Sequence, residues 1–284
     1  MVEKPLLIER KDNVVTLILN RPVKKNSLSP ELVDRLPGAG LNVFHPNELW
    51  RGHYDQLMFD SSVRAISPPA PFGRQATVSW LQAIVDALEL KVDLAATLAP
   101  HLDQGQATWD KLRDAANNHR LAYVVRGSDV RLLTDPANSW GIPLLQASRE
   151  MGFKVEVLLQ RSPDTAETAD EKVLRTQWDE DPDCHIWVFA ERHELAQRLQ
   201  QGSFSAVYSE HFFDRRVTES GCTPFSGQYF ERGLAGAERT LQRLLDVCRL
   251  PFYRRYGRYL GGQAAAGSLS DPWGQEHDST KERH

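Results

Sequence analysis

The sequence predicts an α/β fold in which a parallel β-sheet is covered by helices on both faces. Between residues 130 and 248, short apolar runs of strand length alternate with segments of helical periodicity. Strands joined by single helices form right-handed crossovers and therefore lie parallel in one sheet. The composition agrees with a globular protein, because 41% of the 284 residues are hydrophobic and 25% are charged.

A β-hairpin is expected near the start of the chain. Residues 6–10 and 14–19 are rich in β-forming side chains, and the polar residues between them signal a turn. Ser29-Pro30 places an N-capping serine before a first-turn proline, which predicts that a helix begins there. We treat residues 1–36 as one unit.

An irregular linker is expected to follow over residues 37–73. The segment is rich in turn-forming residues, and it ends in a run where Pro68, Pro69 and Pro71 are separated only by Ala70. Proline lacks a backbone N–H and restricts the residue before it, so this composition opposes both helix and strand.

A helical region is expected between the linker and the sheet. From Gln75 to Leu90, apolar residues recur at three- and four-residue spacing, as in an amphipathic helix. Pro100 is expected to interrupt the next helical segment. A third helix, with Trp109 on its apolar side, is then expected over residues 106–119.

The sheet itself is predicted from four strands. In chain order they span residues 130–133, 154–159, 185–189 and 205–208. The helices expected after them span residues 142–151, 164–171, 194–199 and 234–248, and the second of these is polar and solvated. The helical region and the sheet form one domain over residues 74–260. The Gly-, Ala- and charge-rich residues 261–284 are expected to be a disordered tail.

The loops at the carboxyl ends of the strands are where a ligand would bind in an open parallel sheet. These loops begin at Thr134, Gln160, Ala190 and Ser209, and none of them is rich in glycine. A phosphate cradle at a helix N-terminus is therefore unsupported, which argues against a nucleotide-binding enzyme. The sequence assigns no catalytic residue.

Charge and hydropathy exclude two classes of partner from the expectation. The formal net charge is -4 and the isoelectric point is about 6.2, so neither nucleic acid nor an anionic membrane is an expected partner. The sequence has no apolar run near the roughly 20 residues that span a bilayer and no signal-peptide pattern, so a cytoplasmic location is expected. The cysteines Cys184, Cys222 and Cys248 lack metal-site spacing, and no metal site is predicted.

Several segments, taken in order, resemble one family of oxidoreductases. Pro71-Phe72-Gly73 precedes a helix with Trp80, Thr134-Asp135-Pro136 follows a predicted strand, and residues 224–229 precede the long last helix. This order is similar to the C-terminal domain of nitrogenase component 1 and its relatives, including dark-operative protochlorophyllide reductases. Pro224-Phe225-Ser226-Gly227-Gln228-Tyr229 resembles a Tyr-Ser-Gly-Pro-Tyr segment of a nitrogenase α subunit. The resemblance extends from about Ala65 to Leu245 and implies a flavodoxin-like (Rossmann-like) sheet.

The same resemblance implies a role. The chain would be a nitrogenase component 1-like oxidoreductase subunit fragment, or an accessory protein, that is not catalytic alone. Its partner would be a component 1-type subunit or a second copy. In the α subunit, a histidine just before the Ser-Gly segment binds the active-site cofactor, and the matching position here is about Gly221, beside Cys222. Cys222 is therefore the candidate cofactor ligand, with a structural thiol as the alternative; an iron–sulfur cluster would need further ligands from a partner chain.

A second resemblance is confined to the N-terminal unit. Asn20-Arg21-Pro22, Lys25-Asn26-Ser27-Leu28 and Ser29-Pro30-Glu31-Leu32 look like the opening of the enoyl-CoA hydratase (crotonase) family. This implies the alternative of an acyl-CoA enzyme of the hydratase/isomerase type. Crotonase chemistry needs two backbone N–H groups on the thioester oxygen, and the family's glycine-containing segments that supply them are not found downstream. A non-catalytic scaffold that holds a partner is the third alternative.

The residues after the last predicted helix carry the candidate partner interface. Over residues 252–260, four aromatic residues interleave with three arginines. Tyrosine and arginine supply much of the binding energy at many interfaces. We predict that Tyr253, Arg254 and Tyr256 contact a partner subunit or a second copy. One alternative is that Phe252 and Tyr256 pack back on the domain while the arginines stay solvated. A weaker one is single-stranded nucleic acid, which stacking aromatic rings and arginines suit, although the whole chain is acidic.

Overall fold

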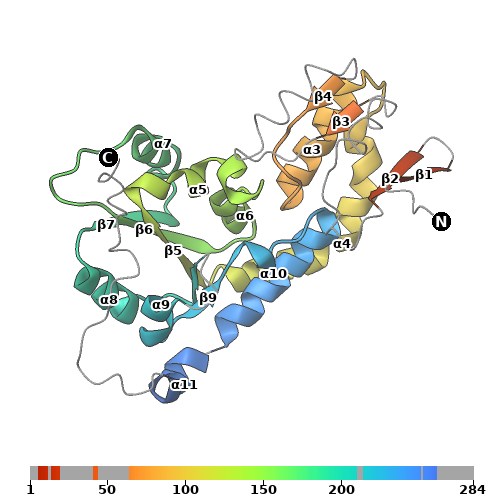
Figure 1. Ribbon diagram of the computed structural model, residues 1–284. Coiled ribbons are helices and arrows are strands. Elements are labelled where there is room, and N and C mark those ends of the chain that lie inside the picture. Colours follow the sequence, from red (N-terminus) through yellow and green to blue (C-terminus); the bar gives the residue numbers. More distant parts are fainter. Residues whose placement is uncertain are drawn as a thin grey trace, which may run out of the picture.

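The structure centres on a five-stranded parallel sheet. It is a computed structural model that describes residues 6–11, 14–19, 41–43, 64–209, 214–250 and 252–260. From one edge to the other, the strands are β7 (Cys184–Phe189), β6 (Lys154–Gln160), β5 (Arg120–Arg126), β8 (Ala206–Tyr208) and β9 (Thr223–Phe225) (Figure 1). Numbered along the chain, this is the order 3-2-1-4-5 of a doubly wound, Rossmann-like sheet. The predicted fold class is confirmed.

Aromatic packing holds the short strands to the middle of the sheet. Tyr123 of β5 lies opposite Tyr208 of β8, which in turn lies opposite Phe225 of β9. The rings of Tyr123 and Tyr208 stack with centroids 5.1 Å apart, and Phe225 meets the two rings edge-on at 5.9 and 5.5 Å. All three side chains are buried. Because neighbouring rings on one face of a sheet attract one another, they stabilise strands that are only three residues long.

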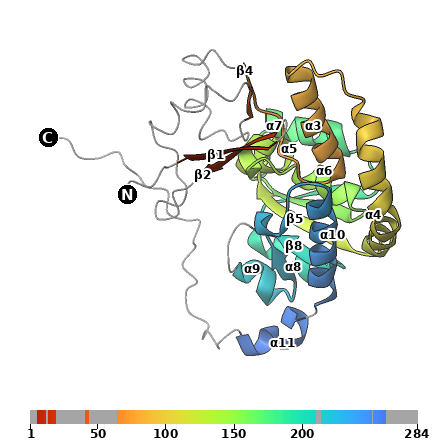
Figure 2. The ribbon, with the colours of Figure 1, turned by 90° about the vertical axis from the view of Figure 1, so that its right-hand side faces the viewer.

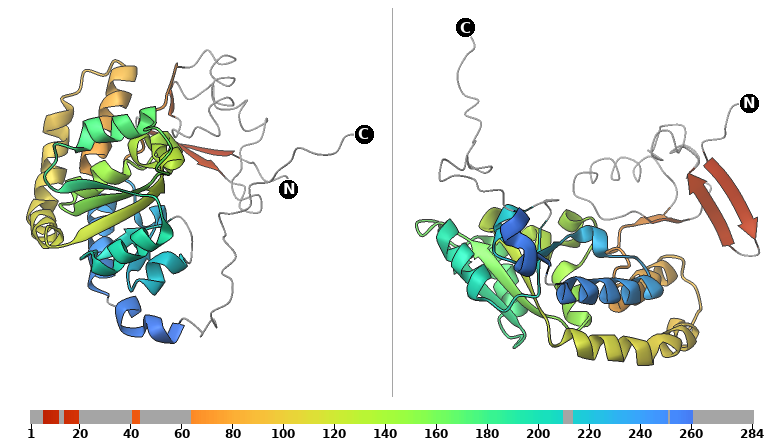
Figure 3. Two further views of the ribbon diagram at one scale, coloured as in Figure 1. Left: turned by 90° about the vertical axis from the view of Figure 1, so that its left-hand side faces the viewer. Right: turned by 90° about the horizontal axis from the view of Figure 1, so that it is seen from below.

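Helices cover both faces of the sheet. One face packs against α4 (Leu94–Ala116), α5 (Arg131–Thr134), α6 (Leu144–Glu150), α7 (Ala169–Trp178) and α10 (Leu234–Arg249) through one cluster of buried side chains. The other face packs against α8 (Arg192–Gln201) and α9 (Arg215–Glu219) through a second cluster. Figure 2 shows α10 in front of β5 and β8, and Figure 3 shows α10 alongside α4. The layered arrangement is the expected one.

The helical region before the sheet consists of α3 (Arg74–Ala87) and α4, where three helices were expected. α4 continues through Pro100. Pro100 cannot donate the helical hydrogen bond to the carbonyl of Ala96, but Ala96 is exposed, so water can bind that carbonyl instead. The side chain of Asp93 caps the helix by accepting a bond from the N–H of Ala96 at 3.0 Å. Trp109 is buried, as predicted.

The first predicted strand is wrong. Val130 is the N-cap of α5, and residues 131–133 form a helical turn, which lies between the 3-10 turns η4 (Gly127–Asp129) and η5 (Pro136–Ser139). The buried side chains there are Val130 and Leu133. Their spacing is that of one helix face, whereas a strand buries alternate residues.

Two strands of the sheet lie where none was predicted. Only three residues separate β5 from the end of α4, and the turn at Asn117-Asn118 between them lies inside the helix predicted over residues 106–119. β9 has three residues and contains Pro224, as is typical of an edge strand. The predicted strands at residues 154–159, 185–189 and 205–208 are present as β6, β7 and β8, and the helices predicted at residues 142–151, 194–199 and 234–248 are present as α6, α8 and α10.

The N-terminal hairpin is also present, as the antiparallel pair β1 (Leu6–Lys11) and β2 (Val14–Leu19). A short parallel pair, β3 (Leu41–Val43) and β4 (Arg64–Ile66), lies inside the range where an irregular path was expected. The expected helix start at Ser29-Pro30 and the expected tail over residues 261–284 lie outside the described residues. The boundaries between the four units remain predictions.

The start of α3 is joined to the start of α10. Phe72 and Arg232 form an isolated antiparallel bridge, and the N–H of Gly233 donates to the carbonyl of Pro71 at 2.8 Å. α11 (Phe252–Leu260) then follows α10. In the part of the chain that the structure describes, no helix combines the length and the apolar character that crossing a membrane requires.

Candidate functional site

The candidate site is the carboxyl edge of the sheet, where the strand order reverses between β5 and β8. Open α/β sheets bind ligands at this switch point. Gly127 follows β5, Arg161 follows β6 and Ser209 follows β8. Two clusters of charged side chains lie along this edge, one near β6 and one near β8.

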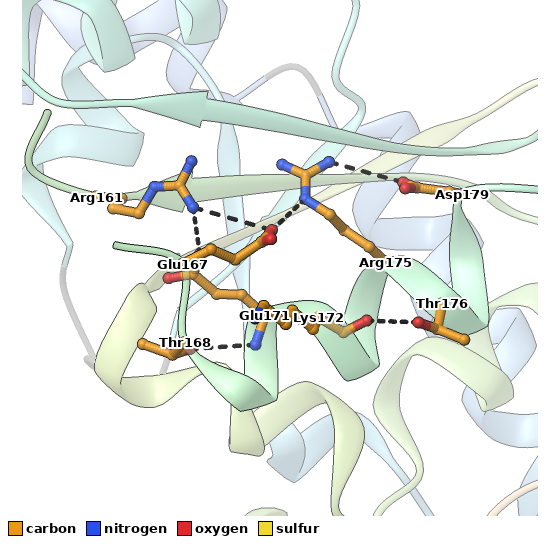
Figure 4. A network of polar contacts seen from close by, with 8 residues as sticks. All are labelled: Arg161, Glu167, Thr168, Glu171, Lys172, Arg175, Thr176 and Asp179. Atoms are coloured by element: carbon orange, nitrogen blue, oxygen red, sulfur yellow. Dashed lines mark hydrogen bonds and ion pairs between the residues drawn. The ribbon is translucent and has the colours of Figure 1, made fainter. Parts of the chain in front are cut away.

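The first cluster joins the end of β6 to α7 (Figure 4). Arg161 donates to the carboxylate of Glu171 at 2.7 Å, and Arg175 donates to Glu167 at 2.7 Å. Arg161 also lies 3.9 Å from Glu167. The hydroxyl of Thr168 caps α7 by accepting from the N–H of Glu171 at 3.2 Å. The two arginines and two carboxylates therefore neutralise one another.

Glu171 corrects the prediction of a solvated helix. α7 begins only at Ala169, and Glu171 is fully buried. A Cβ added to Gly127 would lie 2.4 Å from Oε1 of Glu171, so the backbone turn after β5 rests directly on this carboxylate. Rossmann enzymes bind phosphate at the corresponding first turn. The Glu171 side chain lies against that turn, and the turn lacks the glycine-rich sequence of a phosphate cradle.

The second cluster lies at the end of β8. Asp214 is buried and caps α9, accepting from the backbone N–H of Arg216 at 3.1 Å. The guanidinium of Arg216 binds the same carboxylate through Nε at 3.0 Å and Nη2 at 2.7 Å. Burial alone would raise the pKa of Asp214, but the hydrogen bonds and charge of Arg216 outweigh it and hold that pKa below its usual value. Asp214 is therefore a firmly held carboxylate rather than a general base.

Ser209 has its hydroxyl directed into this second cluster. Its Oγ donates to Oδ2 of Asp214 at 3.0 Å. Because Asp214 is already bound by Arg216, it cannot readily take the serine proton, as an activated nucleophile requires. The geometry of these three residues favours a structural role.

Cys222, the candidate cofactor ligand, lies between α9 and β9. It is 3% exposed, and its Sγ lies 3.7 Å from the carbonyl oxygen of Leu199, to which the thiol donates. Burial raises the pKa of Cys222, and the nearby Arg254 lowers it by less. The residue is thus a protonated thiol at neutral pH, whereas a metal ligand is a thiolate. Its role as a ligand remains a prediction.

No group of three or more metal-binding side chains occurs among the described residues. Cys184 and Cys248 are likewise held as thiols, because burial raises the pKa of each to about 12. The three cysteines are free of disulfides.

The predicted interface residues lie together on α11. A Cβ added to Gly221 would be 3.3 Å from the Cα of Arg254, so α11 rests on the turn before Cys222. Tyr253 is half-buried, whereas Tyr256 is 44% exposed and contacts Phe252, with ring centroids 5.4 Å apart. The aromatic rings therefore do not all pack back on the domain. The structure brings the candidate interface and Cys222 next to each other, although the sequence separates them.

Comparisons with known proteins give little further guidance. No protein-family model matches the sequence, and no curated protein matches it. Among solved structures, a chain described as nitrogenase Cp1 at pH 6.5 superposes with a TM-score of 0.45 and 11% sequence identity, over 82% of this chain and 49% of that one. This chain thus spans about half the length of the nitrogenase chain, and the likeness is a distant one of fold.

Proposed function

We propose that this chain is a nitrogenase component 1-like subunit fragment, or an accessory protein, that is not catalytic alone and acts by binding a partner. The order of the sequence segments from Pro71 to Tyr229 supports the family relation. One observation carries the non-catalytic role: the carboxylates of Glu167, Glu171 and Asp214 at the carboxyl edge of the sheet are each paired with an arginine. This edge is where such a fold would place its chemistry.

The paired charges leave the edge poorly suited to catalysis. A general acid or base needs a pKa near neutrality and a proton that can move. Asp214 is held ionised by Arg216, and Glu171 is buried against Arg161 and Gly127. Each of these groups would have to give up an ion pair before it could act on a substrate.

The partner is proposed to dock on α11. Leu250, Phe252 and Tyr256 are 56%, 46% and 44% exposed, which is unusual for large apolar side chains so close together. Arg254 and Arg255 are exposed beside them. Exposed aromatic residues next to arginines are typical of interface anchors, because both bury much area at a small entropic cost.

Iron analysis tests whether the isolated chain lacks a metal cofactor. The chain purified without oxygen is expected to contain no stoichiometric iron, because Cys222 is buried and no group of three or more metal-binding side chains occurs among the described residues. The measurement is iron per chain together with visible absorption. Near-integral iron that is lost in Cys222→Ala but kept in the control Cys184→Ala would contradict the proposal.

Substitution of α11 tests the docking surface. In Arg254→Ala/Tyr256→Ala, the affinity for a purified component 1-type subunit from the same organism is expected to fall at least about tenfold, because loss of interface anchors costs about 2 kcal/mol or more. The melting temperature is expected to stay within a few degrees, since both side chains are exposed. Isothermal titration measures the affinity.

Trp140→Ala is the matched control for the α11 variant. Trp140 is 61% exposed but lies in the loop before α6, far along the chain from α11. Its replacement is expected to leave the affinity unchanged. An α11 variant that binds as tightly as the unmodified chain, or a chain that binds no such subunit, would exclude this docking surface.

A further inference from the structure

β7 forms one edge of the five-stranded sheet. β7 pairs with β6 on one side, and no strand in the described ranges pairs with its other side. The N–H of Val155 donates to the carbonyl of Asp183 and the N–H of Arg161 to the carbonyl of Phe189, both at 2.8 Å. Along a strand, successive residues point their N–H and C=O groups to opposite sides. Because Asp183 and Phe189 point toward β6, Ile186 and Val188 point both groups away from β6, toward the outer edge.

The two edges of the sheet differ in how they are protected. At the far edge, β9 has three residues and contains Pro224, and the hydroxyl of Thr223 donates to the carbonyl of Leu250 at 3.0 Å. Short length and proline prevent edge-to-edge pairing. β7 has six residues, Cys-His-Ile-Trp-Val-Phe, with neither proline nor lysine nor an acidic residue. Its middle residues Ile186, Trp187 and Val188 are only half-buried.

We propose that β7 pairs antiparallel with β7 of a second copy, which joins the two sheets across a twofold axis at Trp187. In this register Ile186 lies opposite Val188 of the second copy. Each such pair exchanges two backbone hydrogen bonds, so the outward N–H and C=O groups of both residues are satisfied. A register centred on Ile186 would place Val188 opposite Cys184 of the second copy. The N–H of Cys184 already donates to the carbonyl of Asp181 at 3.0 Å, so the carbonyl of Val188 would have no donor. A twofold axis also lets one surface patch serve both copies.

Hydrogen bonding favours the antiparallel direction. The acids of the turn before β7 are largely neutralised within the chain, because Asp181 and Asp183 bind Arg149 and Asp179 lies 3.8 Å from Arg175. The direction follows from the strand itself, since only an antiparallel pair on a twofold axis lets Ile186 and Val188 of the two copies bond each other.

The side chain at the axis suits an interface. Trp187 stacks on Phe189 with ring centroids 5.5 Å apart, and the guanidinium of Arg198 lies 5.8 Å from the centroid of the Trp187 ring. In the proposed register, Trp187 of each copy faces the other in a non-hydrogen-bonded pair, with Cα atoms about 4.5 Å apart. Tryptophan beside arginine is a common centre of protein interfaces.

Disulfide trapping tests the register directly. Trp187→Cys is expected to give a covalent dimer on mild oxidation, because its paired Cα atoms fall within the range that a disulfide spans. His185→Cys is the control, on the same exposed strand and with the same native cysteines. Its Cα atoms would be on the order of 13 Å apart, too far for a disulfide. Equal cross-linking at both positions, or none at Trp187→Cys, would overturn the register.

Sedimentation velocity over a range of concentrations tests the association itself. The unmodified chain is expected to dimerise, and the Val188→Pro variant is expected to remain a monomer. Proline removes the outward N–H that the dimer uses, while every hydrogen bond between β7 and β6 is kept. If Val188→Pro unfolds, amide exchange in the unmodified chain decides instead: Ile186 and Val188 should be slowed only at high concentration. A chain that stays monomeric overturns the proposal. So does a dimer that survives Val188→Pro but dissociates in Arg254→Ala/Tyr256→Ala, because that contact would lie at α11.

Discussion

Glu156→Ala is expected to lower the free energy of unfolding by about 2 kcal/mol, because it removes a buried carboxylate that two partly exposed arginines bind. Glu156 lies within β6 and is fully buried. Its Oε1 accepts from Arg198 through Nε at 2.6 Å, with Nη2 at 2.5 Å, and its Oε2 accepts from Arg120 at 3.3 Å. Without the carboxylate, the guanidinium groups of Arg120 and Arg198, which are 30% and 36% exposed, would lose the anion that they share.

Glu231→Ala is the control for this prediction. Glu231 also binds two arginines, Arg239 at 2.6 Å and Arg243, but its side chain is 27% exposed and the arginines are about half exposed. Water replaces such surface pairs readily, so a much smaller loss is expected. Urea denaturation of both variants measures the difference. Equal losses would mean that the burial of Glu156 does not determine its contribution.

Gly152→Ala is expected to cost about 3 kcal/mol, from backbone strain and a steric clash together. Gly152 ends α6 with φ of 90°, a conformation that residues with a Cβ rarely adopt. A Cβ there would lie 2.7 Å from the backbone carbonyl oxygen of Arg113 in α4. That carbonyl belongs to a helix packed on the sheet, so it cannot move away without disturbing the core.

Gly233→Ala separates the two contributions. Gly233 has φ of 80°, but a Cβ there would meet nothing within 4 Å. Only backbone strain remains, at φ 80° and ψ 173°, a region that is essentially limited to glycine, and about 2 kcal/mol is expected. The measurement is the midpoint of urea unfolding for each variant, at equal denaturant dependence. If both variants lose the same stability, α4 and α6 are less closely packed than the structure indicates.

The sequence predicts the longer elements of this fold because their periodicity is strong. It fails where local signals compete with tertiary packing. β5 is missed because the turn at Asn117-Asn118 is short and falls inside the helix predicted over residues 106–119. The helical turn over residues 130–133 is apolar enough to resemble a strand. Pro100 predicts a helix break, but α4 continues through it, because Ala96 is exposed and water can bind the carbonyl that Pro100 leaves without a donor.

The candidate site shows the same division. The aromatic and basic side chains of α11 are contiguous in sequence, so a surface containing Tyr253, Arg254 and Tyr256 can be proposed without a structure. The buried acids cannot be predicted from the sequence, because their burial depends on partners that are distant along the chain. Glu156, for example, binds Arg120 and Arg198, which are 36 and 42 residues away. An isolated glutamate in an apolar run signals such a pair only when strand neighbours are known.

The position of α10 has a consequence for how the protein is made on the ribosome. α10 packs along α4, and its Leu241, Leu244 and Leu245 complete the cluster that contains Trp109. These contacts join segments more than a hundred residues apart, and such contacts form late in folding. A nascent chain that has released β5, β6 and β8 therefore still exposes one apolar face of the sheet. Premature termination before residue 234 would leave a product that chaperones and proteases recognise, rather than a smaller stable domain.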